Sequence, residues 1–124
     1  MDEGMTIAQV SECTGLTAHT LRYYERTGLL LQPPPRGGNG HRRYTERDVG
    51  WVRLLTRLRA TGMPITGMRR YAEMAREGRD TYAARKELLE AHRADVLARI
   101  EQLRDDLALI ENKINTYDKL MGEL

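Results

Sequence analysis

A seven-residue apolar repeat in the last third of the chain constrains its fold more than any other feature. Apolar residues recur there at alternating spacings of four and three, the pattern of a helix that buries one stripe against another helix. The stripe consists of Val96, Ile100, Leu103, Leu107, Ile110, Ile114, Tyr117 and Met121. Leu89 extends it backward, and Arg93 interrupts it. Because no proline and no glycine separates Asp80 from Gly122, we expect one continuous helix of about 65 Å.

A helix of this length cannot fold back on the small remainder of a 124-residue chain. Its apolar stripe must therefore be covered by another chain, and a homodimer is the simplest solution. The repeat alone leaves open whether the two helices run parallel or antiparallel.

The N-terminal part predicts two short helices with a tight turn between them. Thr6 and Gln9 have the spacing of a capping box, and Gly15 ends the first helix. Thr17 is the cap of a second helix, which Gly28 ends. This arrangement is typical of a helix-turn-helix.

The second helix has two contrasting faces. Ala18, Leu21 and Tyr24 share one face, which we expect to pack inward. The other face carries cationic, aromatic and hydrogen-bonding groups rather than the mixture of Glu and Lys found on an idle surface. These residues are His19, Arg22, Tyr23 and Arg26.

Residues 32–41, QPPPRGGNGH, cannot form a helix because of their three prolines. Arg42, Arg43 and Tyr44 follow directly. We interpret this region as a β-hairpin wing with a Gly-rich tip, and a plain linker is the alternative.

Two further helices are expected before the long one. The third begins at Thr45, with Asp48 in its first turn, and its core stripe consists of Val49, Val52, Leu55 and Leu58. Trp51 and Leu54 lie off that stripe, so their apolar surface needs another partner, such as a neighbouring subunit. Gly62 ends this helix, and Pro64 suits the start of a fourth, which buries Ile65, Met68 and Ala72 and breaks near Gly78.

We therefore place a DNA-binding domain at 1–77 and a dimerisation helix at 78–124.

Charge divides the chain in the same way. Residues 1–79 hold 13 Lys and Arg against 8 Asp and Glu, and residues 80–124 hold 7 against 10. A basic head favours a polyanionic partner, with a merely solvated surface as the alternative. No apolar run approaches the length of a membrane helix, and the single cysteine, Cys13, cannot form an internal disulfide. We expect a cytoplasmic protein without a membrane partner.

An enzyme is not expected. The sequence has no Gly-rich phosphate loop, no Ser or Cys paired with His, and no pair of carboxylates with a plausible cleft. Asp105 and Asp106 are adjacent on a helix and point about 100° apart, as on a solvated face. No cofactor is expected either.

Three segments together resemble the MerR family of bacterial transcription regulators: TIAQVSECTGLTAHTLRYYERTGLL, GHRRYTERDV and LRATGMPITGM. The resemblance covers residues 6 to about 75, and the long helix fits the family's dimerisation helix. It implies a winged helix-turn-helix followed by an antiparallel coiled coil between two subunits. His41 replaces the family's commoner tyrosine, and Gly37-Gly38 makes a loose wing tip. The residues that it assigns to DNA are Arg22, Tyr23, Tyr24, Arg42, Arg43 and Tyr44. Thr17, His19 and Thr20 are added to them because they lie at the N-terminal end of the helix that would enter the major groove.

The resemblance also implies a mechanism. Family members bind an approximately palindromic promoter site whose spacer is too long for RNA polymerase, and the activated dimer bends and untwists that spacer. The direction of regulation and the target genes are not encoded in any pattern of the sequence.

The effector, if there is one, is not identified by the sequence. Relatives that sense metals carry cysteines at the start and past the end of the dimerisation helix, and no cysteine stands at either place here. His19, His41 and His92 lack ligand spacing, and Cys13 is expected to be inert. A small molecule would bind where the long helix meets the head, in a crevice lined by Trp51, Met68, Tyr71 and Tyr82, with Met63 and Met74 nearby. Ordinary packing at this joint is the alternative.

Two other functions remain open. The first is a non-specific architectural DNA-binding protein with the same head. The second is a coiled-coil interaction protein whose head has lost DNA binding.

Overall fold

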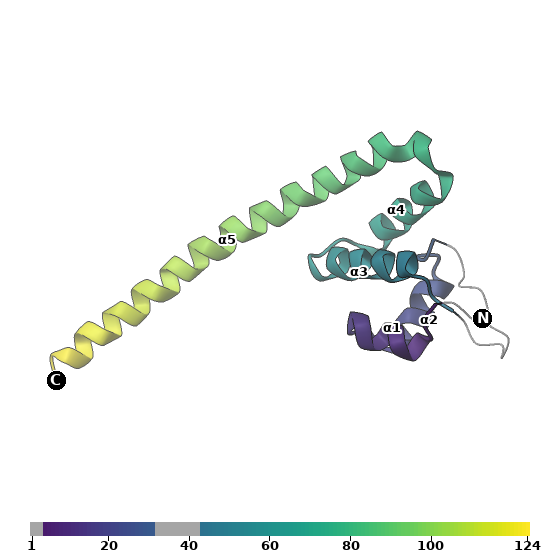
Figure 1. Cartoon of the computed structure of the whole chain (residues 1–124). Coiled ribbons are helices and arrows are strands. Elements are labelled where there is room, and N and C mark those ends of the chain that lie inside the picture. Colours follow the sequence, from purple (N-terminus) through teal and green to yellow (C-terminus); the bar gives the residue numbers. More distant parts are fainter. Residues whose placement is uncertain (1–3, 32–42) are drawn as a thin grey trace. The chain divides into compact units, whose positions relative to one another are not determined.

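The computed structural model describes residues 4–31 and 43–124, and it is helical through most of these ranges (Figure 1). Four helices form the head: α1 (Ile7–Thr14), α2 (Ala18–Arg26), α3 (Glu46–Ala60) and α4 (Ile65–Glu77). A 3-10 turn, η1 (Arg79–Thr81), leads into α5 (Tyr82–Gly122), which has 41 residues. The prediction of a mainly α chain with a helix-turn-helix and a long last helix is confirmed. The predicted β-hairpin wing falls largely on residues 32–42, which lie outside the described residues.

Reciprocal caps begin α1 and α3, as the sequence predicts. The Thr6 hydroxyl accepts a hydrogen bond from the Gln9 amide at 3.2 Å, and the Gln9 side chain accepts one from the Thr6 amide at 2.8 Å. Thr45 and Asp48 repeat the pattern at 3.1 and 2.8 Å. These bonds satisfy amides that have no partner inside the helix. Gly15 ends α1 with a φ of 76°, a left-handed conformation that glycine adopts without strain.

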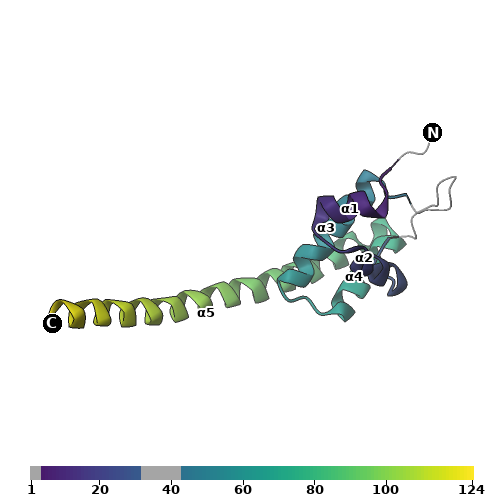
Figure 2. The ribbon, with the colours of Figure 1, turned by 90° about the horizontal axis from the view of Figure 1, so that it is seen from below.

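The core of the head lies where α1 to α4 meet, and Figure 2 shows these helices gathered in one cluster. Side chains from all four helices contribute to this core. The core stripe predicted for α3 is buried along its whole length. The completely buried large side chains are Val10, Leu21, Leu29, Tyr44, Val52, Leu55 and Met68.

A short backbone pairing ties the start of the chain to the segment before α3. The Met5 amide donates to the Tyr44 carbonyl at 2.6 Å, and the Tyr44 amide donates to the Met5 carbonyl at 2.8 Å. Gly4 precedes this antiparallel bridge with a φ of 104°, and a Cβ atom placed there would lie 2.6 Å from the Tyr44 oxygen. Glycine is therefore required for this close approach.

Trp51 finds its partner within its own chain, which corrects the expectation that it needs a neighbouring subunit. Its ring stacks on Tyr71 of α4, with centroids 5.4 Å apart and planes at 22°. Its indole N–H also donates to the Leu29 carbonyl at 2.7 Å. Leu54 remains half-exposed.

The break near Gly78 is confirmed, and a buried threonine stabilises it. Gly78 has a φ of 99°, and the Thr81 hydroxyl lies within hydrogen-bonding distance of the Met74 carbonyl at 2.6 Å and of the Gly78 carbonyl at 2.7 Å. The Arg85 guanidinium donates to the Thr81 hydroxyl at 3.0 Å and to the Gly78 carbonyl at 3.1 Å. The backbone is thus redirected between α4 and α5 with its polar groups paired.

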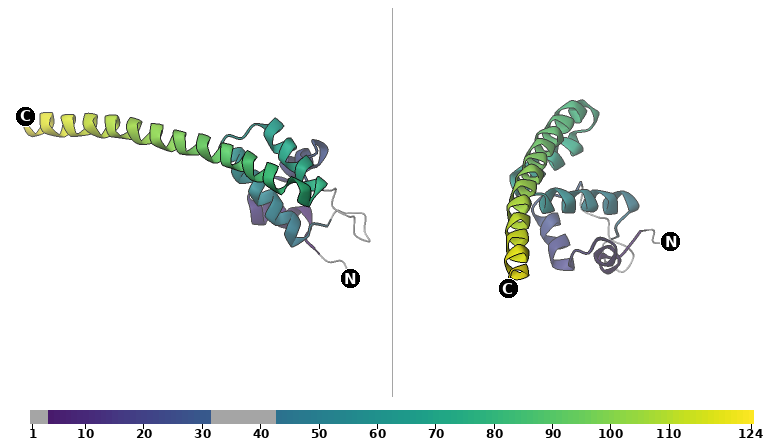
Figure 3. Two further views of the ribbon diagram at one scale, coloured as in Figure 1. Left: turned by 90° about the horizontal axis from the view of Figure 1, so that it is seen from above. Right: turned by 90° about the vertical axis from the view of Figure 1, so that its left-hand side faces the viewer.

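Two compact units make up the chain, Met1–Leu88 and Leu89–Leu124, and they meet within α5. The division at 77 and 78 coincides instead with the end of α4, and it remains a prediction about function. The second unit is one uninterrupted helix, as the two views of Figure 3 show. None of the side chains of α5 is buried, and the apolar stripe is exposed from Ile100 onward, by 39% at Ile100 and up to 66% at Leu103, while Val96 is half-buried. The stripe is therefore unpartnered within a single chain.

None of the helices in the described ranges combines the length and the apolar character that a bilayer span requires.

Candidate nucleic-acid interface

Two threonines with neighbouring hydroxyls, Thr17 and Thr20, stand at the N-terminal end of α2. Thr17 caps the helix by accepting a hydrogen bond from the Thr20 amide at 3.1 Å. The two hydroxyls lie 3.0 Å apart. A helix N-terminus carries unpaired amides and a partial positive charge, so this end of α2 suits a phosphate or a base edge.

The two faces of α2 differ as the sequence predicts. Leu21 and Tyr24 are buried, whereas His19, Arg22 and Arg26 are exposed. Tyr23, the remaining member of that face, is also accessible, with 38% of its surface exposed. Thr20 is half-buried. The structure therefore brings Thr17, His19, Arg22 and Tyr23 together on one accessible surface.

Tyr24 belongs to the core rather than to this surface. Its side chain is only 5% exposed, and its ring lies 6.3 Å from that of Tyr23. Burial raises the pKa of the Tyr24 phenol above its usual value, while the nearby Arg59 guanidinium acts in the opposite direction. Arg59, an exposed residue of α3, consequently lies close to α2. In this structure Tyr24 supports the face that carries Arg22.

The wing residues divide into three groups. Arg36, His41 and Arg42 lie outside the described residues. Arg43 is half-buried. Tyr44 is completely buried, which corrects its place among the residues expected to face DNA. Tyr44 pairs with Met5 through its backbone, and its side chain is part of the core of the head.

The C-terminal end of α2 is held by side chains from α3 and α4 that the sequence analysis missed. Arg76 donates to the Gly28 carbonyl at 3.1 Å and to the Leu30 carbonyl at 2.8 Å. Arg69 donates to the Thr27 carbonyl at 3.1 Å. Together with Trp51, these cations bind four successive carbonyls, those of residues 27–30. They fix the segment between α2 and residue 31 on the rest of the head.

We expect Arg76→Ala to lower the free energy of unfolding by roughly 1–2 kcal/mol, because two carbonyls lose a charged donor. Arg70→Ala is the matched control in the same helix, since Arg70 is exposed and its guanidinium lies 3.8 Å from the Glu73 carboxylate. Its effect should stay within about 0.5 kcal/mol. Denaturant unfolding at one protein concentration measures both, and equal effects would show that the Arg76 bonds do not form in solution.

A shallow hollow of about 310 Å³ lies in the head near the start of α5. Trp51 and Tyr71 line it, as the effector prediction required, but Met68 is completely buried in the core. Tyr82 is 60% exposed and lies under the Arg85 guanidinium, 4.6 Å from it. The full lining is Leu31, Arg47, Gly50, Trp51, Leu54, Tyr71, Ala75 and Arg85. Whether an effector binds here stays a prediction.

Cys13 is exposed on α1. Across residues 4–31 and 43–124, the His, Cys, Asp and Glu side chains form no group of three that could hold a metal ion.

Comparison with known proteins gives a consistent result. A family described as MerR HTH family regulatory protein matches residues 5–75, and a second, MerR DNA binding, matches residues 49–111. An uncharacterized HTH-type transcriptional regulator of Haemophilus influenzae is 38% identical over 114 residues, covering 92% of this chain and 84% of its own length.

Solved structures agree with these matches. The crystal structure of HiNmlR, a MerR family regulator lacking the sensor domain and bound to promoter DNA, has a TM-score of 0.85 and 37% identity, and covers 94% of this chain and 92% of its own. A MerR family regulator from Listeria monocytogenes has a TM-score of 0.87 and 34% identity, over 93% of this chain and 86% of its own.

Proposed function

The chain belongs to the MerR family of HTH regulators, and on that premise we propose that it is a transcriptional regulator that binds a palindromic promoter site as a homodimer. The observation that carries the proposal is the division of α2 into a buried face and an accessible cationic and aromatic face. HiNmlR, which matches nearly the whole chain, was solved on promoter DNA, and this supports the same ligand here.

Each exposed group on α2 has a role that follows from its chemistry. With α2 in the major groove, the planar fork of Arg22 reaches a base edge or a phosphate. Thr17, His19 and Thr20 stand at the N-terminal end of the helix, where contacts to bases begin. Tyr23 and the wing arginines hold the sugar-phosphate backbone, which sets the register of the complex rather than its sequence preference.

Two heads joined through paired α5 helices bind two half-sites of one duplex. In the proposed mechanism the dimer distorts the spacer between the promoter elements, and RNA polymerase then contacts both. Backbone contacts supply the free energy of this deformation. A small molecule bound in the hollow beside Trp51 would act on the segment between α2 and residue 31, because the Trp51 N–H holds the Leu29 carbonyl.

Footprinting upstream of the chain's own gene and its neighbours tests the proposal. The expected result is a protected, approximately palindromic site between two promoter elements. Binding to that site and to a scrambled duplex is then compared at several salt concentrations, because phosphate contacts alone give affinity that depends on salt and not on sequence. Equal affinity for both duplexes would replace the proposal with an architectural role.

We expect Arg22→Ala to weaken binding to the palindromic duplex by roughly 1–3 kcal/mol, because one exposed guanidinium contact is removed from each head. The fold should be unchanged, since Arg22 lies outside the core. Fluorescence anisotropy at fixed salt measures the affinity. Lys119→Ala, which removes an exposed cation from the C-terminal turns of α5, is the control and should bind as tightly as the parent. An unchanged affinity for Arg22→Ala would favour a coiled-coil interaction protein that has lost DNA binding.

A further inference from the structure

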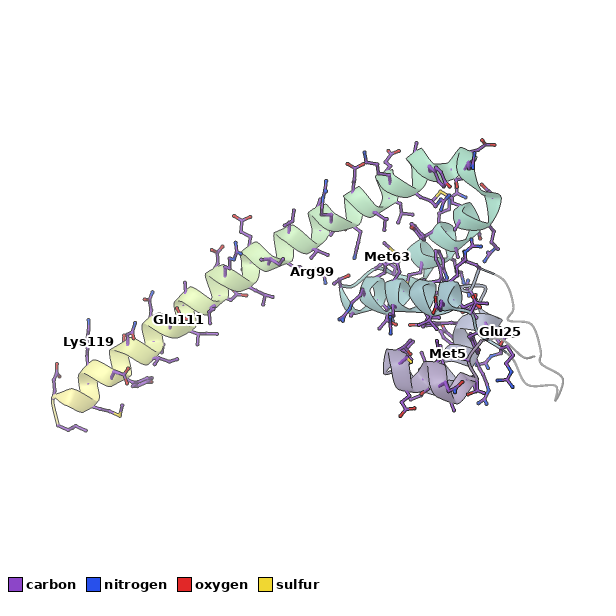
Figure 4. The ribbon with its side chains drawn as sticks, viewed as in Figure 1. Met5, Glu25, Met63, Arg99, Glu111 and Lys119 are labelled. Carbon is purple, nitrogen blue, oxygen red and sulfur yellow. The ribbon has the colours of Figure 1, made fainter. Side chains whose placement is uncertain are left out.

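The charges beside the apolar stripe of α5 select one alignment of two helices. In a helix with this repeat, the residues that flank the stripe lie against flanking residues of the partner helix, and their charges decide orientation and register. On one flank stand Leu97, Arg104, Glu111 and Asp118. On the other flank stand Arg99, Asp106, Lys113 and Leu120. Figure 4 shows two residues on opposite flanks, Arg99 and Glu111, projecting from the helix.

The family resemblance implies an antiparallel pair of α5 helices. We propose the register of that pair: its two-fold axis lies between Ala108 and Leu109, with Arg104 against the partner's Glu111 and Asp106 against the partner's Lys113. The proposal rests on the homodimer proposed above and adds its register. The partner helix is that of a second copy of this chain, and the charges on the two flanks are complementary in this alignment.

The apolar residues fit this alignment without a gap. Leu107 lies opposite the partner's Ile110, and Leu103 lies opposite the partner's Ile114. The outer layers pair Ile100 with the partner's Tyr117 and Val96 with the partner's Met121. All of these side chains except Val96, which is half-buried, are substantially exposed in the single chain, from 39% at Ile100 upward. Pairing therefore removes eight apolar side chains of each copy from water.

The flanking charges then meet with opposite sign. In antiparallel pairs each flank faces the same flank of the partner, and the nearest residues are about two positions apart along the axis, roughly 3 Å. Arg104 meets the partner's Glu111 on one side, and Asp106 meets the partner's Lys113 on the other. Because the dimer is symmetric, each contact occurs twice, which gives four attractive pairs next to the central layers.

Sliding the helices by one repeat places like charges together. When the partner moves seven residues in one direction, Arg104 meets its own symmetry mate, and so does Asp106. In the other direction Glu111 and Lys113 each meet their own mates, while Arg104 meets the partner's Asp118, so attraction and repulsion offset each other. Either slip shifts the helices by about 10 Å, so the charges also fix the spacing that two heads can offer to DNA.

A parallel pair is disfavoured by the same residues. In that arrangement one flank contacts the other flank of the partner about five residues further along. Arg99 would then face the partner's Arg104, and Asp106 would face the partner's Glu111. Only Lys113 and the partner's Asp118 would attract. Like charges dominate, whereas the antiparallel alignment described above has none among its nearest flanking pairs.

Charge reversal on the full-length protein tests this register. R104E puts two Glu–Glu contacts into its homodimer, and E111R puts in two Arg–Arg contacts. Each variant should dimerise about tenfold more weakly than the parent at low salt. An equimolar mixture should form heterodimers in clear excess of the statistical share, because both contacts become attractive between unlike chains. The doubly reversed R104E/E111R should recover the parent's affinity as a homodimer.

Sedimentation equilibrium measures the dissociation constants, and native mass spectrometry measures the heterodimer fraction. The control is D105K, a reversal next to Arg104 on the helix face opposite the stripe, which should leave dimerisation unchanged. Raising the salt should reduce the heterodimer preference by screening. A statistical mixture with no rescue in the double variant would overturn the register while leaving the dimer intact. A parent protein that sediments as a single chain would instead overturn the homodimer itself.

Discussion

Leu107→Asp separates the dimer into single chains and reduces binding to a palindromic operator by about a hundredfold or more. Leu107 is 52% exposed in one chain and becomes central to the seam when two α5 helices pair. The substitution places an unpaired carboxylate in an apolar layer, and symmetry does so twice. Two separate heads must then bind their half-sites independently. Joining the heads in one dimer raises the effective concentration of the second head, which is typically worth 10²–10⁴ in affinity.

Sedimentation equilibrium measures the dissociation of the dimer, and fluorescence anisotropy measures the affinity for the operator. Ala108→Asp is the matched control, because it introduces the same charge one residue along on the outward face of the helix. That variant should dimerise and bind as the parent does. If Leu107→Asp remained dimeric, the apolar stripe would not be the dimer seam, and the proposal of paired heads would fail.

Leu55→Ala destabilises the head by about 2–5 kcal/mol. Leu55 has no exposed surface and lies in the middle of the buried face of α3, so its truncation loses transfer free energy and leaves a cavity. Small domains have total stabilities of roughly 5–15 kcal/mol, so the variant approaches the limit of folding at physiological temperature. Because α2 belongs to the same head, DNA binding should fall together with stability.

Thermal or denaturant unfolding followed by circular dichroism checks this expectation at one protein concentration. Leu54→Ala is the control, because Leu54 is the neighbouring residue of the same type and is only half-buried. Its effect should be about 1 kcal/mol or less. Equal losses from both variants would mean that α3 does not present the face toward the core that this structure describes.

Local signals in the sequence predicted most of the fold. The caps at Thr6 and Thr45, the glycine stop at Gly15 and the break at Gly78 each depend on residues within a few positions of one another, and all are confirmed. The family assignment is confirmed in the same way, because the motifs that carry the resemblance are contiguous.

Contacts between distant residues could not be predicted in this way. Trp51 lies off the core stripe of α3, and its stacking on Tyr71 depends on how α3 crosses α4. Arg69 and Arg76 bind carbonyls 42 to 48 residues away, and two arginines on a helix look like an ordinary solvated face. Tyr44 follows two arginines, so its position in the motif suggested a surface role, whereas its pairing with Met5 directs it inward.

Trp51 gives the protein a fluorophore of its own at an informative place. It is the single tryptophan of the chain. Its ring stacks on Tyr71 of α4, and its N–H donates a hydrogen bond to the Leu29 carbonyl, just past the end of α2. Indole emission depends on hydrogen bonding and on ring contacts. Unlabelled protein therefore reports optically on any rearrangement at this joint, whether DNA, a small molecule or dissociation of the subunits brings it about.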